Sequence, residues 1–149
     1  MQAKTPRKRP ATPRKKAAPV PVPEISIAVE ETAPEELVPT WLTAIRAAED
    51  KQALDIQVLD LRGITTMADT FFICNGRNPR QNQAICDEIE QRVKDVHGER
   101  PMAIEGLKNA EWVLMDYGDL VVHIFSEAAR EYYDLGRLYR DAQRLQAPA

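Results

Sequence analysis

This 149-residue sequence is poor in cysteine, histidine and serine, and it has no long run of apolar residues. Its two cysteines, Cys74 and Cys86, stand in an apolar run and in a helical pattern, which indicates buried, reduced thiols and argues against a disulfide framework. No stretch approaches the roughly 20 apolar residues that cross a bilayer, and residues 1–23 lack the apolar core of a signal peptide. We therefore expect a soluble, cytoplasmic protein that does not bind membranes.

Charge is distributed unevenly along the chain. The net charge is −3, yet residues 1–23 hold seven Lys and Arg and no acid. Five glutamates between positions 24 and 36 reverse the sign, and residues 40–149 carry a net charge of −5. A folded part with this charge favours basic partners, whereas the first 23 residues favour acidic ones.

Proline is concentrated at the start, where eight of the eleven prolines lie within residues 1–39. Because proline interrupts helices and central strands, and large apolar residues are few there, we interpret residues 1–39 as a disordered basic arm followed by an acidic linker. Such an arm either contacts RNA phosphates or only keeps the protein in solution. A transit peptide is disfavoured, because proline would break the amphipathic helix that such peptides need.

Residues 40–149 show the periodic patterns of one α/β domain. A helix is expected from Thr40, as N-cap, to about Ala53. A second helix is expected from its N-cap Asn78 to Gly98. The expected strands are Ile56–Leu61, Thr70–Cys74, Met102–Glu105, Glu111–Asp116 and Leu120–Phe125, and a final helical region begins at Ser126.

This order of elements predicts a mixed sheet of about five strands flanked by helices. The strand before the Asn78 helix should be parallel to a strand after it, because a helical crossover joins them. The last two strands should form an antiparallel hairpin.

The most informative segment joins those last two strands through Asp116, Tyr117, Gly118 and Asp119. Gly118 can adopt the positive φ of a tight turn, so the segment is first of all a hairpin loop. If Tyr117 and Gly118 are the loop, the two aspartates form a like-charged cross-strand pair, which disfavours folding unless something basic covers it. Tyrosine and Trp112 are typical interface anchors, so we interpret this end of the domain as a docking surface for a macromolecule. The alternative for Trp112 is a place in the core.

The same residues give little support to a catalytic or metal-binding site. Asp116, Asp119 and His123 are conceivable metal ligands, but a lone strand histidine is more often a core or interface residue. Asn75-Gly76-Arg77 lacks the glycine spacing and the lysine of phosphate-binding loops, and no serine or cysteine nucleophile has a histidine beside it. His97, in the last turn of its helix, is expected to be solvated. We expect no enzyme activity, no metal and no cofactor.

Several ordered motifs resemble the ribosomal silencing factor (RsfS, Iojap-related) family over about residues 41–142. They comprise Met67–Glu90, Ile104-Glu105-Gly106, Trp112–Asp119, Val121–Phe125 and Arg130–Leu135. The resemblance implies a nucleotidyltransferase-like α/β fold in a protein that binds the large ribosomal subunit. The Gly-Ser and Asp-x-Asp motifs of nucleotidyltransferases are missing, so the fold does not carry their activity with it. The alternative is an enzyme or a nucleotide-binding protein of that fold.

Members of this family dock on a basic protein of the large subunit, number fourteen, and block joining of the small subunit when nutrients are scarce. Carried onto this sequence, the resemblance implies a set of partner-binding residues. They are Trp112, Leu114, Asp116, Tyr117 and Asp119, with Glu105 nearby. The acidic charge of residues 40–149 agrees with a basic partner. The basic arm departs from the family pattern, so contact with ribosomal RNA is our hypothesis for it, and we expect that the free protein can form a homodimer.

Overall fold

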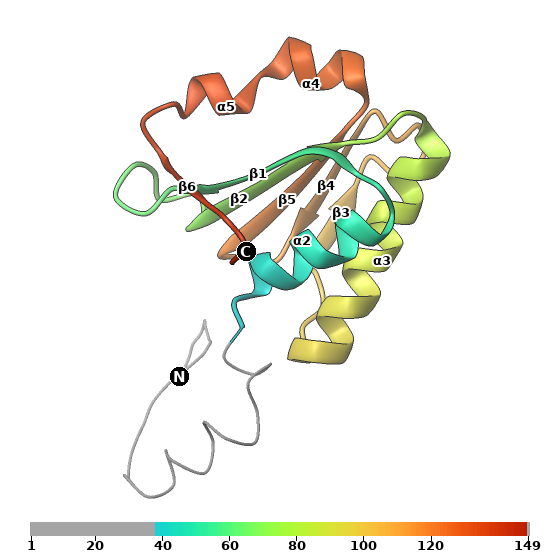
Figure 1. Cartoon of the computed structure of the whole chain (residues 1–149), viewed down its shortest axis with the longest axis horizontal. Coiled ribbons are helices and arrows are strands. Elements are labelled where there is room, and N and C mark those ends of the chain that lie inside the picture. The colour runs from blue at the N-terminus through green and yellow to red at the C-terminus, as the bar shows by residue number, and fades with distance from the viewer. Residues whose placement is uncertain (1–37, 149) are drawn as a thin grey trace, which may run out of the picture. The chain divides into compact units, whose positions relative to one another are not determined.

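The computed structural model describes residues 38–148 (Figure 1). The predicted arm and linker at 1–39 lie outside the described residues, except for Val38 and Pro39, which lead into the first helix. Within the described part, no helix is long and apolar enough to cross a membrane.

A six-stranded mixed sheet forms the centre of the domain, in the strand order β3-β4-β5-β2-β1-β6. Its strands are β1 (Leu54–Asp60), β2 (Thr70–Asn75), β3 (Ala103–Glu105), β4 (Trp112–Asp116), β5 (Leu120–Phe125) and β6 (Gln143–Leu145). β2 and β5 run parallel, whereas every other neighbouring pair is antiparallel. These pairings confirm the predicted mixed sheet, its parallel pair and the antiparallel hairpin of β4 and β5.

Helices cover both faces of this sheet (Figure 1). They are α2 (Thr40–Asp50), α3 (Pro79–His97), α4 (Glu127–Tyr133) and α5 (Leu135–Leu138). The helices α2 and α3 pack together on one face, which we call the α2/α3 face, and the two short helices lie over the other, the α4/α5 face. Phe72 and Ile124 are buried on the α2/α3 face, whereas Phe71 and Phe125 are buried on the α4/α5 face. Successive residues of one strand thus belong to different core layers.

Local sequence signals set both ends of α3, as predicted. The side chain of Asn78 accepts a hydrogen bond from Gln81 N at 2.8 Å, and Pro79 takes the first helical position, where its missing N–H costs nothing. At the other end Gly98 adopts the left-handed conformation, with φ 69°, that stops the helix.

Two predictions about the first helix are wrong, and one strand was not predicted. Thr40 is the first residue of α2 and not its cap, because the carbonyl oxygen of Pro39 already accepts from the helix, and α2 ends at Asp50, before the predicted Ala53. Ser126 caps the final helical region as predicted, since its side chain accepts from Ala129 N at 3.1 Å, and Asp134 at φ 34° divides this region into two short helices. The strand β6 was not expected, since it is short and polar and becomes a strand by pairing with β1.

Both cysteines and both histidines of the domain are buried or half-buried. Cys74 and Cys86 are buried free thiols, as predicted, and burial raises the pKa of each to about 12. His97 was expected to be solvated, yet its Nε2 lies 2.8 Å from Thr43 Oγ1 of α2, and burial lowers its pKa. His123 of β5 is only 4% exposed, and burial lowers its pKa to about 4. A neutral imidazole is therefore part of the core.

The connection between β3 and β4 requires glycine at position 106. Gly106 has φ +86°, and a Cβ there would lie 2.1 Å from the carbonyl oxygen of Trp112. From α3, Asn82 Nδ2 holds the same connection by donating to the carbonyl oxygen of Ala110 at 2.8 Å. Any side chain at position 106 must therefore displace the first residue of β4.

Gly106→Ala should destabilise the domain more than Gly63→Ala. Both glycines have a positive φ, +86° and +83°, so alanine at either position loses about 1–2 kcal/mol to backbone strain. At Gly106 the added Cβ also meets the backbone of Trp112, whereas nothing lies within 4 Å of a Cβ at Gly63. Urea unfolding followed by circular dichroism should therefore show the larger loss of unfolding free energy for Gly106→Ala. Equal losses would contradict the close contact.

Acid should destabilise the protein through His123. Its pKa of about 4 in the folded state lies below the ordinary value of 6.5, so the unfolded state binds the proton first as the pH falls. The stability contributed by the neutral ring is complete above pH 6.5 and is lost towards pH 4, at about 1.4 kcal/mol per pH unit. The unfolding free energies of wild type and His123→Gln should therefore converge over this window. Parallel curves would show that His123 does not cause the loss, because all other titrating groups are common to both proteins.

Candidate docking surface

The strand β4 presents alternate side chains to opposite faces of the sheet. Val113 and Met115 are fully buried on the α2/α3 face. Trp112, Leu114 and Asp116 point to the opposite face, where each is partly exposed. The three predicted docking residues of β4 therefore share one surface.

The strand β3 brings a fourth predicted residue to this surface. Antiparallel pairing sets Glu105 opposite Leu114 and Ala103 opposite Asp116, so each pair points to the same side of the sheet. Both β3 residues are exposed, and β3 is an edge strand. The helix α4 packs further along the sheet, on β2 and β5. We call Glu105, Trp112, Leu114 and Asp116 the β4 surface.

Trp112 is held by contacts within the core of the α4/α5 face. Its Nε1 donates a hydrogen bond to Nδ1 of His123 at 3.1 Å. Its ring lies 4.5 Å from that of Tyr133 in α4 and 5.1 Å from that of Phe125, between centroids. Because Nδ1 accepts, the neutral His123 carries its proton on Nε2, which is buried without a hydrogen-bond partner among the described residues. Trp112 is thus part core and part surface, a combination of the two alternatives that the sequence left open.

Tyr117 lies on the other side of the sheet, which corrects the predicted arrangement. Its ring packs against the core of the α2/α3 face, and its hydroxyl is buried without a hydrogen-bond partner among residues 38–148. Burial, followed by the charge of Glu90, raises the pKa of Tyr117 above its ordinary value. Since Tyr117 directly follows Asp116, and successive residues point to opposite faces, it does not join the β4 surface.

The predicted cross-strand pair of Asp116 and Asp119 is wrong. Asp116 pairs with Val121, and Tyr117 N donates to the carbonyl oxygen of Leu120 at 2.9 Å, so the register differs from the expected one. The loop consequently consists of Gly118 and Asp119. Asp116 Oδ1 accepts from Gly118 N at 2.8 Å, which caps the turn. The two carboxylates therefore do not face each other across the strands.

Asp119 lies near Asp69 at the end of the sheet, away from the β4 surface. Its carbonyl oxygen accepts from Asp69 N at 2.9 Å and from Thr70 N at 3.0 Å, which ties the loop to the start of β2. Partial burial, followed by the charge of Asp69, raises the pKa of Asp119. A pocket of about 320 Å³ beside it is lined by Thr40, Arg62 and other residues of this end. Asp119 thus lies beyond the last pair of the β4 ladder.

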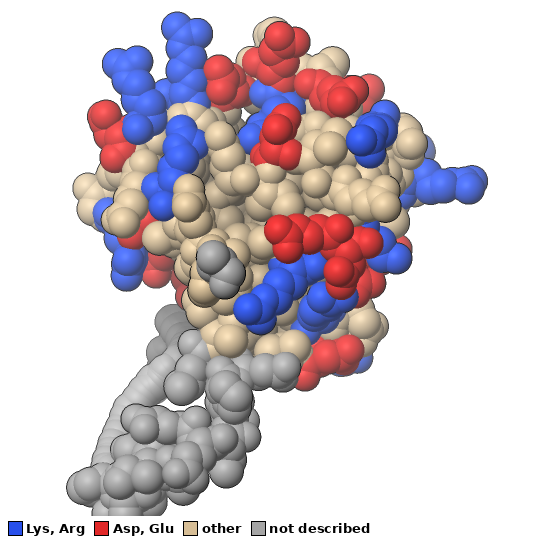
Figure 2. Space-filling view, in the orientation of Figure 1, with Lys and Arg blue, Asp and Glu red and all other residues tan. Residues whose placement is uncertain are grey.

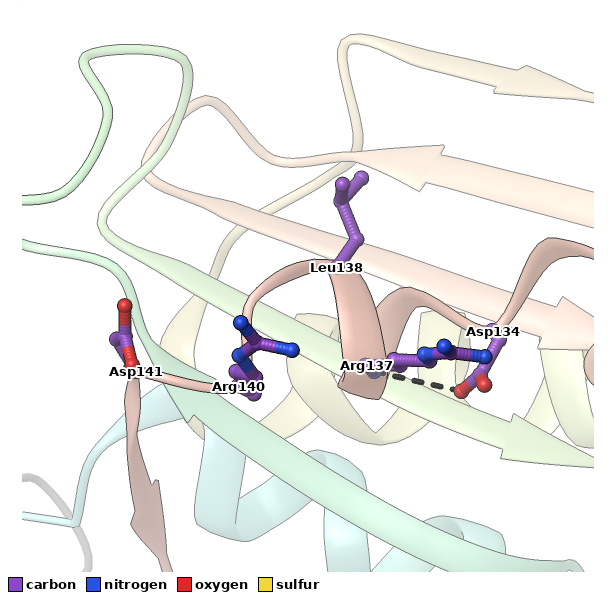
Figure 3. Close-up of a pocket in the computed structure, with 5 residues that line it drawn as sticks. All are labelled: Asp134, Arg137, Leu138, Arg140 and Asp141. Atoms are coloured by element: carbon purple, nitrogen blue, oxygen red, sulfur yellow. Dashed lines mark hydrogen bonds between the residues drawn. The ribbon is translucent and has the colours of Figure 1, made fainter.

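Within residues 38–148, the metal ligands that the sequence offered as an alternative do not form a metal-binding cluster. No group of three or more His, Cys, Asp or Glu side chains there could hold a metal ion. A pocket of about 480 Å³ lies on α5 and is lined by Asp134, Arg137, Leu138, Arg140 and Asp141. In Figure 3, Leu138 points away from Asp134, whose Oδ1 accepts from Arg137 N at 3.3 Å. This pocket holds no pairing of a nucleophile with a base.

The sequence of the chain is similar to known proteins. A family model described as "Ribosomal silencing factor during starvation" matches residues 32–149. The ribosomal silencing factor RsfS of Bacillus subtilis (strain 168) is 46% identical over 99 residues, which are 66% of this chain and 83% of that protein. The RsfS protein of Halalkalibacterium halodurans is 41% identical over 99 residues, which are 66% of this chain and 84% of that protein.

The fold is also similar to that of a solved structure. The crystal structure of a protein from Chromobacterium violaceum matches with a TM-score of 0.65 and 33% sequence identity, over 74% of this chain and 88% of that one. The family model spans most of the chain, and it includes every motif on which the resemblance in sequence rested. The chain therefore belongs to the ribosomal silencing factor (RsfS) family.

Proposed function

We propose that this protein binds the large ribosomal subunit through the basic subunit protein fourteen and sterically blocks joining of the small subunit. Translation then falls when nutrients are scarce. The family is one of ribosomal silencing factors, which is a regulatory role and not an enzymatic one. The observation that carries the proposal is the β4 surface, where partly exposed Trp112 and Leu114 lie beside the carboxylates of Glu105 and Asp116.

The make-up of the β4 surface suits a basic protein partner. Trp112 and Leu114 offer an apolar centre, and a tryptophan at the centre of an interface is a frequent source of binding energy. Glu105 and Asp116 add negative charge at its border, which favours a positively charged surface and speeds association. Because His123 and Tyr133 already hold the indole ring of Trp112, little side-chain entropy is lost when a partner covers it.

To block subunit joining sterically, this protein needs only to bind tightly at the right place. A molecule bound where the two subunits meet prevents their contact without any chemical step. We place this action in the cytoplasm, where the subunits join. The homodimer expected for the free protein stays a prediction, with the partly apolar β4 surface as its proposed contact.

We assign the basic arm a second contact, with ribosomal RNA. Residues 1–23 hold seven Lys and Arg and no acid, so they suit phosphates, whereas residues 40–149 with a net charge of −5 suit a basic protein. Residues 1–23 would then contact the RNA of the large subunit, and residues 40–149 would contact its protein.

Isolated large subunits should bind the wild-type protein, and the bound protein should lower the yield of joined ribosomes when small subunits are added. Reversing the charges with Glu105→Lys and Asp116→Lys should weaken binding about tenfold or more, because like charges then face the basic partner. Co-sedimentation with large subunits at constant salt measures the first effect, and density-gradient profiles measure the second.

Two further variants serve as controls. Glu49→Lys makes one such charge reversal at an exposed position of α2, on the other face of the sheet, and should bind like the wild type. Asp116→Asn keeps an acceptor for Gly118 N while it removes the charge, so it separates the stability of the turn from docking. A wild-type protein that does not pellet with large subunits would refute the proposal.

Deleting residues 1–23 should weaken subunit binding and make it less dependent on salt. Each phosphate contact that is lost lowers the slope of log affinity against log salt concentration by roughly 0.7–0.9, because fewer counterions are released on binding. Titrations of the full and shortened chains at several salt concentrations measure this slope. An unchanged slope would reject the RNA contact and leave docking on the protein partner intact.

A further inference from the structure

A line of aromatic rings leads from the β4 surface onto the outer side of α4. The rings of Trp112 and Tyr133 lie 4.5 Å apart, and those of Tyr133 and Tyr132 lie 4.9 Å apart at 88°. Exposure increases along this line, since Trp112 is partly buried, Tyr133 is 45% exposed and Tyr132 is 81% exposed. The edge-to-face contact with Tyr133 orients the Tyr132 ring, while most of its surface remains open to solvent.

The outer side of α4 is acidic as well as aromatic. Glu127 and Glu131 are both exposed and lie one helical turn apart, where like charges destabilise a helix. Neither forms an ion pair within the described part of the chain. Arg130 points inward instead, where it donates to Asn75 Oδ1 at 3.0 Å, and burial lowers its pKa. Along the top of Figure 2, acidic side chains gather over α4.

We infer that α4 extends the docking surface, and that Tyr132 with Glu127 and Glu131 receives a lysine or arginine side chain of the basic partner protein. A cation over a tyrosine ring is attracted by the negative face of the ring, and adjacent carboxylates add charge-assisted hydrogen bonds. The inference rests on the proposed function, because it names a second contact for the same partner. Continuity through Tyr133 and Trp112 places this contact beside the β4 surface.

Leu138 is also a large exposed side chain, but it lacks the features that we use to assign a binding role to Tyr132. It is 68% exposed on α5, but it stands beside Arg137 and Arg140 and takes no part in the line of rings. An apolar side chain among arginines does not attract a cation. Leu138 therefore provides a matched control, an exposed large side chain on the adjacent short helix.

Tyr132→Ala should weaken binding about tenfold, both to isolated large subunits and to purified subunit protein fourteen. Tyr132→Phe should bind within about twofold of the wild type, because the ring face is preserved. Leu138→Ala should also bind like the wild type. Since Tyr132 is largely exposed, its replacement should leave the unfolding transition almost unchanged, which circular dichroism verifies.

Three outcomes would overturn the inference. If Tyr132→Ala binds like the wild type while the double variant at Glu105 and Asp116 binds weakly, α4 lies outside the interface and the proposed function stands. If Tyr132→Ala weakens binding to subunits but not to the purified protein, the ring contacts RNA and the inferred partner is wrong. If the wild-type protein binds neither, the proposed function fails together with this inference.

Discussion

The register in which β4 pairs with β5 decides which side chains this protein shows to a partner. In that register Leu114 stands opposite His123, with Asp116 on the same face. A slip by one residue would turn Leu114 and Asp116 into the core of the α2/α3 face. Gly106 allows the chain before β4 to pass close to the carbonyl oxygen of Trp112, where a Cβ would lie 2.1 Å away. The proposed docking surface is therefore a consequence of strand pairing and not of an irregular loop.

Trp112 connects this surface with the interior. Its hydrogen bond to the buried, neutral His123 gives the indole N–H a partner in surroundings where an unpaired donor is costly. Contact with Tyr133 fixes the ring from a second direction, and Tyr132 continues the aromatic line into solvent. Groups that stabilise the fold thus also hold the ring of Trp112, so this side chain is oriented before a partner arrives.

Most elements could be predicted from the sequence, because their signals are local. Asn78 and Gly98 end α3 through a side-chain cap and a left-handed residue, and both features depend on residue type alone. The strand β6 escaped prediction, because its three residues have no apolar period and gain their hydrogen bonds from β1. The sequence also predicts a solvated His97, because only the packing of α2 against α3 brings Thr43 to that ring.

The sequence by itself determined the family, the mixed α/β fold, the ends of the long helix and four residues of the proposed surface, because periodicity and motifs are properties of the chain. Only the tertiary structure decided that Tyr117 faces the α2/α3 core while its neighbour Asp116 faces the docking side. It also decided that Tyr132 of α4 adjoins Trp112 through Tyr133. The physical reason is that side-chain direction alternates along a strand, so a shift of the loop by one residue moves a side chain between faces, and no local signal fixes that position.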